Sequence, residues 1–354
     1  MGLLDETNKT LGRARYAAAQ GLRSAWYSAH YTAARRRAGG FNRPGEAPFR
    51  AEKGPPDTAA LRRAFLDLFV QDRRNVEDGL YPAPNDVRLR DLGRALRSSR
   101  AFLADVPEVD RRRVARDGAE VRAQVAADRF PAYYRQNFHY QSDGWLSDDS
   151  ARIYDTQVET LFAGAADAMR RAALAEIARE LKGRDQRQVA LLDVACGTGR
   201  FLAQILSAYP KLQATGLDLS PNYAEKARRA VSNWAQADIV EGAAEAMPIE
   251  DASQDLVVSV YLFHELPPRV RPAVFEEIAR VLKPGGLFVF ADSLQFGDNP
   301  ALDGLLEYFP EGFHEPYYKG YLKADLAAEI EAAGFVSEGG STAFLTKIAR
   351  WRRG

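Results

Sequence analysis

From Val189 onward, short apolar runs alternate with stretches of helical pattern, and this alternation limits the fold more than any other feature of the sequence. Five runs have the length and apolar content of strands: VALLDVA, LQATGLD, ADIVEG, DLVVSVYLF and GLFVFADS. Strands that alternate with helices form a parallel sheet with helices on both faces. We therefore predict a doubly wound α/β domain in the C-terminal half of the chain.

The first predicted strand leads into a glycine-containing loop that runs from Asp193 to Gly199. Gly197 and Gly199 allow the backbone to approach a ligand closely where the strand ends and the next helix begins. The second strand ends at Asp218, whose carboxylate can accept hydrogen bonds from both hydroxyls of a ribose. The alternative is that Asp218 only caps the helix that starts at Pro221. The loop lacks the third glycine of dinucleotide-binding loops.

Together with residues 255–266 and 280–286, this loop and Asp218 resemble the motifs of class I S-adenosylmethionine-dependent methyltransferases. The resemblance covers about residues 186–350, and it is strongest to the small-molecule branch that includes the ubiquinone and menaquinone C-methyltransferases. It implies a Rossmann-like, seven-stranded sheet with a reversed last hairpin near residues 334–348. It also implies S-adenosyl-L-methionine as the cofactor.

The resemblance further implies which residues contact that cofactor. They are Tyr154, Asp193, Ala195, Cys196, Gly197, Gly199, Asp218, Leu219, Ala244, Glu245, Val260 and Tyr261. Asp193 and the glycine loop line the methionine end, Asp218 holds the ribose, and Leu219 packs on the adenine. The family's usual Gly-Asp-Ala-Glu reads Gly-Ala-Ala-Glu here, so the backbone at Ala244 or the side chain of Glu245 is expected to replace the missing aspartate.

A histidine and two aromatic clusters are the candidates for chemistry and substrate binding. His264 follows the fourth strand, and its ordinary pKa of roughly 6.5 suits a general base. The alternative is a histidine that only supports the site. Residues 130–148 and 308–321 are rich in aromatic side chains, and we expect Tyr140, Trp145, His314 and Tyr317 to form substrate walls. Core packing beneath the helical region is the competing interpretation.

The chain before the predicted sheet has helical patterns and no strand pattern. We divide it into a basic N-terminal helix (1–45) and a helical lid and substrate wall (46–185), followed by the methyltransferase domain (186–354). Residues 9–43 contain basic residues and aromatic side chains but no acidic residue, which is consistent with peripheral contact with an anionic membrane. A basic helix that packs on its own protein is the alternative.

Composition narrows the possible functions. The 48 basic and 48 acidic residues balance, so no overall charge attracts nucleic acid. One cysteine allows neither an internal disulfide nor a cysteine-clustered metal site, and we predict no metal and a cytoplasmic location. The predicted function is methyl transfer to a small, apolar or aromatic molecule. Cofactor binding without methyl transfer is the alternative, and methylation of nucleic acid is a weaker one.

Overall fold

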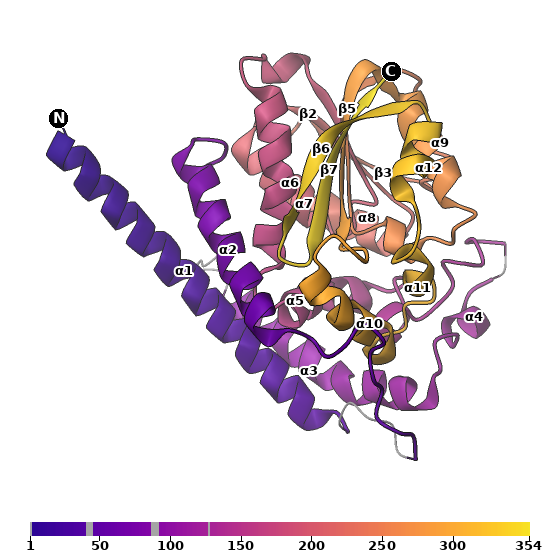
Figure 1. Cartoon of the computed structure of the whole chain (residues 1–354). Coiled ribbons are helices and arrows are strands. Elements are labelled where there is room, and N and C mark those ends of the chain that lie inside the picture. Colours follow the sequence, from indigo (N-terminus) through magenta and orange to yellow (C-terminus); the bar gives the residue numbers. More distant parts are fainter. Residues whose placement is uncertain (1, 40–44, 86–91, 127) are drawn as a thin grey trace.

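A seven-stranded sheet forms the centre of the molecule (Figure 1). The computed structural model describes residues 2–39, 45–85, 92–126 and 128–354, with side chains from residue 9 onward. The strands are β1 Ala190–Val194, β2 Gln213–Asp218, β3 Ala237–Glu241, β4 Gln254–Val260, β5 Leu282–Ser293, β6 Phe335–Ala343 and β7 Thr346–Arg353. Their order is β3-β2-β1-β4-β5-β7-β6, and β7 runs in the opposite direction to the other strands. The predicted strands and the reversed last hairpin are confirmed.

Both faces of the sheet are buried because neighbouring strand residues alternate between two hydrophobic cores. Leu191 and Val258 face α6 (Ala166–Leu181), α7 (Arg200–Ala208) and α8 (Pro221–Val231). Leu192 and Val257 face the opposite core, which is covered by α9 (Arg271–Val281), α11 (Tyr318–Tyr321) and α12 (Leu326–Ala332). Because β1 to β5 run parallel to one another, their carboxyl ends and the loops that follow them lie at the same edge of the sheet.

The region before the sheet is helical, as predicted, but several helix boundaries differ from the pattern. The helices are α1 Gly2–Arg37, α2 Thr58–Glu77, α3 Leu92–Ala115, α4 Val121–Gln124 and α5 Asp148–Leu161, and α10 (Asp303–Gly312) follows the fifth strand. The helical sequence pattern extends over about residues 107–128 and 150–182, but neither stretch is one continuous helix. Arg116 ends the first with a φ of 56°, and Ala163 and Gly164 break the second with φ values of 50° and 82°.

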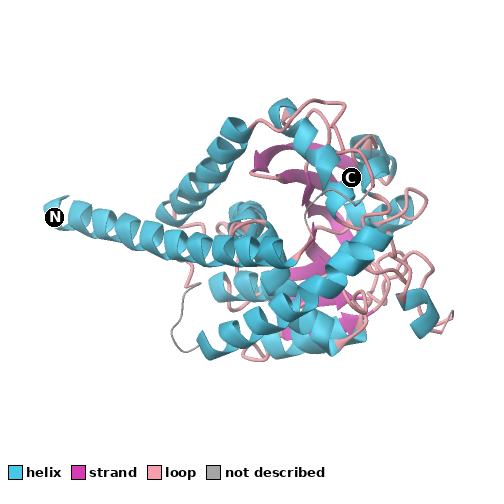
Figure 2. Cartoon of the chain, turned by 90° about the horizontal axis from the view of Figure 1, so that it is seen from below, coloured by secondary structure: helices cyan, strands magenta, loops and turns pink. Residues whose placement is uncertain are grey.

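Helix α1 projects beyond the body at its N-terminal end, whereas its C-terminal half packs against the protein (Figure 2). Arg23 donates to Asp167 Oδ2 at 2.7 Å and contacts Glu159 Oε1 at 2.7 Å, and all three side chains are buried. Gly164 allows this close approach, since a Cβ there would lie 3.1 Å from the carbonyl oxygen of Arg23. Part of α1 is thus an integral element of the fold.

The aromatic side of α1 that suggested a membrane surface lies mostly against the protein. Tyr16 is buried and donates to Asp72, and His30 is also buried. Tyr31 is 47% exposed, and residues 40–43 of the basic stretch lie outside the described residues. Membrane contact through residues 9–43 therefore remains a prediction. Tyr16 and His30 do not support it, because they are buried. Within the described part of the chain, no helix has the length and apolarity needed to cross a bilayer.

The predicted domain boundary at residue 186 lies just before β1. The segments on its two sides are packed against each other. Ala173, Leu174 and Ile177 of α6 belong to the same hydrophobic core as the β1 and β4 side chains. The helical region and the sheet are thus joined by shared core contacts.

Candidate active site

The glycine loop follows β1 at the carboxyl edge of the sheet. Ala195, Gly197 and Gly199 have φ values of 60°, 57° and 72°, so the backbone turns sharply before α7. A Cβ on Gly199 would lie 2.8 Å from the Cα of Ala227, so only glycine allows α7 and α8 to approach this closely. The Gly197 N–H donates to Asp218 Oδ2 at 2.8 Å, which links the loop to the end of β2.

Two buried carboxyl groups lie beside this loop. The second oxygen of Asp218 accepts from the Ser220 N–H at 2.9 Å. Burial raises the pKa of Asp218 to about 6, although its two backbone hydrogen bonds oppose the shift. Burial, and next the charge of Asp218, raise the pKa of Asp193 to about 8. Oδ2 of Asp193 is buried without a hydrogen-bond partner among the described residues, so a ligand donor can bind there.

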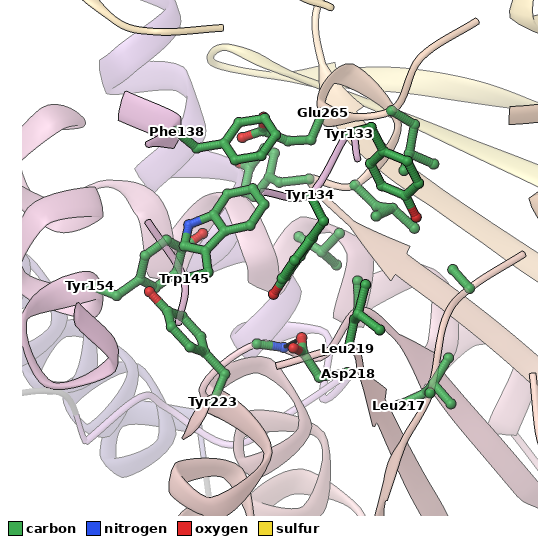
Figure 3. A pocket seen from close by; sticks show the side chains of 18 residues that line it. Tyr133, Tyr134, Phe138, Trp145, Tyr154, Leu217, Asp218, Leu219, Tyr223 and Glu265 are labelled. Carbon is green, nitrogen blue, oxygen red and sulfur yellow. Dashed lines mark hydrogen bonds between the residues drawn. The ribbon is translucent and has the colours of Figure 1, made fainter. Parts of the chain in front are cut away.

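Two adjoining cavities open around these groups (Figure 3). The larger encloses about 770 Å³ of empty space, and the smaller about 380 Å³. Both are lined by Tyr154, Ala195, Gly197, Val260 and Tyr261. In Figure 3, Asp218 and Leu219 lie at one end of the larger cavity and Glu265 lies at the other.

Most of the residues expected to contact the cofactor line these cavities. Asp218, Leu219 and Ala244 line the larger one, whereas Asp193 and Cys196 line the smaller one. Gly199 and Glu245 do not line either cavity. Glu245 instead lies behind the wall, where it accepts a hydrogen bond from Tyr133 at 2.7 Å, and Tyr133 faces the cavity.

Of the four expected substrate walls, only Trp145 lines the cavity. Its ring stacks on Phe138 at a centroid separation of 4.2 Å. Tyr140 packs against His314, with ring centroids 5.5 Å apart.

Tyr317 is held away from the cavity by Gln136. Gln136 bonds the Tyr317 hydroxyl at 2.8 Å, and its other side-chain atom lies 3.0 Å from His314 Nε2. Tyr140, His314 and Tyr317 therefore pack where the 130–148 segment meets the loop after α10, instead of forming one chamber with Trp145.

Several lining residues were not selected from the sequence. They are Tyr133, Tyr134, Phe138, Tyr223, Glu265 and Leu266. The first three belong to the aromatic segment at 130–148, but its pattern does not indicate which rings face the cavity. Glu265 follows His264 directly, so the motif that indicated the histidine also contained this carboxylate.

His264 does not line either cavity, and its surroundings do not favour a general base. Its Nδ1 lies 2.5 Å from Asp292 Oδ1, and its Nε2 lies 3.5 Å from Glu265 Oε1. Burial lowers the pKa of His264, but the charges and hydrogen bonds of Asp292 and Glu265 outweigh burial and raise it well above the usual value. A protonated imidazole has no free lone pair with which to accept a proton.

Comparisons with known proteins found several methyltransferases. Residues 191–286 match the model of a methyltransferase domain family. An uncharacterised methyltransferase from Synechocystis is 32% identical over 41% of this chain and 66% of its own length. Demethylmenaquinone methyltransferase from Staphylococcus aureus is 33% identical over 29% of this chain and 43% of its own. A solved S-adenosylmethionine-dependent methyltransferase from Aquifex aeolicus is 17% identical, with a TM-score of 0.39, over 51% of this chain and 88% of its own.

The family match and the strand order identify a class I S-adenosylmethionine-dependent methyltransferase domain. The chain spans less than two thirds of the length of these two relatives, at 66% and 43%. The activity and substrate of the whole chain are therefore proposed below.

Proposed function

We propose that this chain transfers the methyl group of S-adenosylmethionine to a small, apolar or aromatic molecule. The observation that carries the proposal is that the two cavities share a wall at the ends of β1 and β4. A cofactor beside the glycine loop and an acceptor beneath the aromatic residues would therefore meet. When bound, S-adenosylmethionine supplies a methyl group on a positively charged sulfur, which an aligned nucleophile can attack.

The buried carboxyl groups fit the two polar ends of this cofactor. Asp218 lines the cavity, and each of its oxygens accepts only one backbone N–H, so lone pairs remain for ribose hydroxyls. The unpartnered oxygen of Asp193 faces the smaller cavity and suits the ammonium group of the methionine part. Alanine at 195 and glycine at 197 keep the loop narrow enough for a ligand to lie against its backbone.

The acceptor end of the larger cavity is mainly aromatic. Tyr134, Phe138 and Trp145 supply flat apolar walls, and Glu265 supplies a charged group between them and the end of β4. Such a cavity favours a planar or apolar molecule with a polar tip. Glu265 Oε2 has no hydrogen-bond partner among the described residues, so it is free to accept a hydrogen bond from the acceptor.

His264 has a positioning role in this proposal. Asp292 fixes one nitrogen of the ring, and the other nitrogen faces Glu265. The positive ring lowers the cost of keeping Glu265 ionised at a buried site. His264 therefore acts on the acceptor through Glu265.

Transfer of isotope-labelled methyl groups tests the proposal. The purified chain is incubated with methyl-labelled S-adenosylmethionine and a lysate, and the organic extract and nucleic acid are counted separately. The proposal predicts label in the organic extract, absent with Asp218→Ala. Label in RNA or DNA would support the nucleic-acid alternative. Cofactor binding without any labelled product across lysates would leave a binding protein that transfers nothing.

A further inference from the structure

A buried polar cluster lies beside the larger cavity, and the mechanism above uses only one of its members. His139 comes from the 3-10 helix η2 (Phe138–Tyr140), Glu265 from η4 (Phe263–Glu265), and Glu315 from the loop between α10 and α11. Nε2 of His139 lies 2.6 Å from Glu315 Oε1 and 3.4 Å from Glu265 Oε1. One ligand atom from each of the three residues lies within 4.8 Å of the others.

Three of the four carboxylate oxygens of this cluster are buried without a hydrogen-bond partner among the described residues. The exposed fractions of Glu315, Glu265 and His139 are 5%, 6% and 7%. Apart from the ion-pair contacts with histidine, both oxygens of Glu315 and Oε2 of Glu265 have no hydrogen-bond partner among the described residues. Burying two carboxylates in this way is costly unless a cation binds them.

We propose that His139, Glu265 and Glu315 bind one divalent transition-metal ion. Imidazole nitrogen with carboxylate oxygens is a donor set used by zinc, manganese and iron sites, whereas magnesium prefers oxygen alone. Ligand atoms about 2.1 Å from a tetrahedral zinc ion lie about 3.4 Å apart. The separations of 2.6 Å and 3.4 Å are close enough to this value that small side-chain movements complete the site.

The surroundings of the cluster support the same assignment. His139 and Tyr140 both have positive φ, 57° and 56°, in a buried segment, and this is backbone strain of the kind that gathers at functional sites. His264, itself held by Asp292, lies behind Glu265, and carboxylates that bind metal ions are commonly hydrogen-bonded by such outer residues.

The metal site also narrows the class of methyl acceptor. This inference rests on the proposed function, because it takes the larger cavity as the place where the acceptor binds. Because Glu265 lines the larger cavity, an ion bound by the cluster has one side toward the acceptor. A divalent ion there would bind an acceptor oxygen and lower the pKa of its hydroxyl group. The acceptor class this favours is a hydroxylated molecule.

Direct metal binding tests the site without any turnover. The full chain is stripped with a chelator and titrated with Zn²⁺ by calorimetry and with Co²⁺ by visible absorption. One ion per chain is expected, with a Co²⁺ spectrum typical of mixed nitrogen and oxygen ligands. Each of His139→Gln, Glu265→Gln and Glu315→Gln should weaken binding at least roughly tenfold.

Matched controls come from His30 and His314, two of the three histidines outside the cluster; the third, His264, contacts Glu265. The chain has four histidines, and His30→Gln and His314→Gln should keep one Zn²⁺ per chain. Failure of the stripped wild-type chain to bind Zn²⁺ or Co²⁺ would overturn the site, and leave His139 as the cation of an ion-pair cluster. This result does not depend on any variant folding.

S-adenosylmethionine is titrated in parallel. Cofactor binding without metal binding overturns only the metal site, whereas metal binding without cofactor binding overturns only the proposed function.

Discussion

The backbone N–H of Gly197 donates to Asp218 Oδ2 at 2.8 Å, so the glycine loop after β1 and the carboxylate that ends β2 form one unit. A ligand held by Asp218 is thereby placed beside the loop. The orientation of the carboxylate depends on this bond and on the Ser220 N–H, because no side-chain donor reaches it among the described residues.

Asp218→Ala should weaken binding of S-adenosylmethionine and of S-adenosylhomocysteine by about 1–3 kcal/mol, because ribose hydroxyls would lose their acceptor. Calorimetry measures the change. Glu241→Gln is the matched control, since Glu241 pairs with Asp218 in the sheet but points to Arg228 at the surface. Equal affinity in Asp218→Ala and wild type would remove Asp218 from the site.

Asp193→Asn should stabilise the ligand-free chain increasingly as the pH rises. Folding raises the pKa of this carboxyl from 3.8 to about 8, so the folded state holds its proton more tightly. The stability that this gives is full below pH 3.8 and is lost as the pH rises toward 8. Asparagine does not ionise, so the variant should gain on the order of 5 kcal/mol over wild type at alkaline pH, at about 1.4 kcal/mol for each pKa unit.

Urea unfolding at several pH values measures this difference, and calorimetry follows the cofactor. The same variant should bind S-adenosylmethionine more weakly, since it loses an acceptor for the ammonium group. If the difference in unfolding free energy between the variant and wild type did not change with pH, folding would not raise the pKa of Asp193.

Arg23→Met should destabilise the chain by about 3 kcal/mol, because it leaves the buried Glu159 and Asp167 with one cation fewer. Arg15→Met, on the exposed side of the same helix, should change the free energy of unfolding by less than about 0.5 kcal/mol. Thermal or urea unfolding gives both values. Equal stability of the two variants would show that α1 is not docked through Arg23.

His264→Gln should lower turnover without changing the shape of the pH–rate profile. A positioning residue leaves that shape unchanged, whereas a general base gives wild type a rate that rises with pH near its pKa. The profile of kcat is measured for both proteins between about pH 5.5 and 8. If kcat of wild type rose with pH near the pKa of a histidine and kcat of the variant did not, His264 would be the general base.

The motifs predicted the sheet and the cofactor edge well because both depend on local sequence. The strand patterns and the loop from Asp193 to Gly199 lie within short segments, and chain direction alone brings Asp218 to the same edge. Aromatic content likewise indicated the segment that contributes Trp145.

The remaining features depend on contacts between distant segments. Tyr140 faces His314, and His139 faces Glu315, only because α10 and its following loop fold over η2. The docking of α1 depends on Gly164, more than a hundred residues further along the chain. Local sequence patterns do not encode such pairings. The sequence therefore left open whether the N-terminal helix packs on the protein or on a membrane, and it grouped Tyr140, His314 and Tyr317 with Trp145 as substrate walls.

The most direct test of the account is an experimental structure of the chain with S-adenosylhomocysteine. The account predicts the ribose at Asp218, the adenine beside Leu219 and the amino-acid end over Asp193, with the sulfur directed toward the cavity beneath Trp145. A bound ligand that contacts neither Asp193 nor Asp218 would contradict the account.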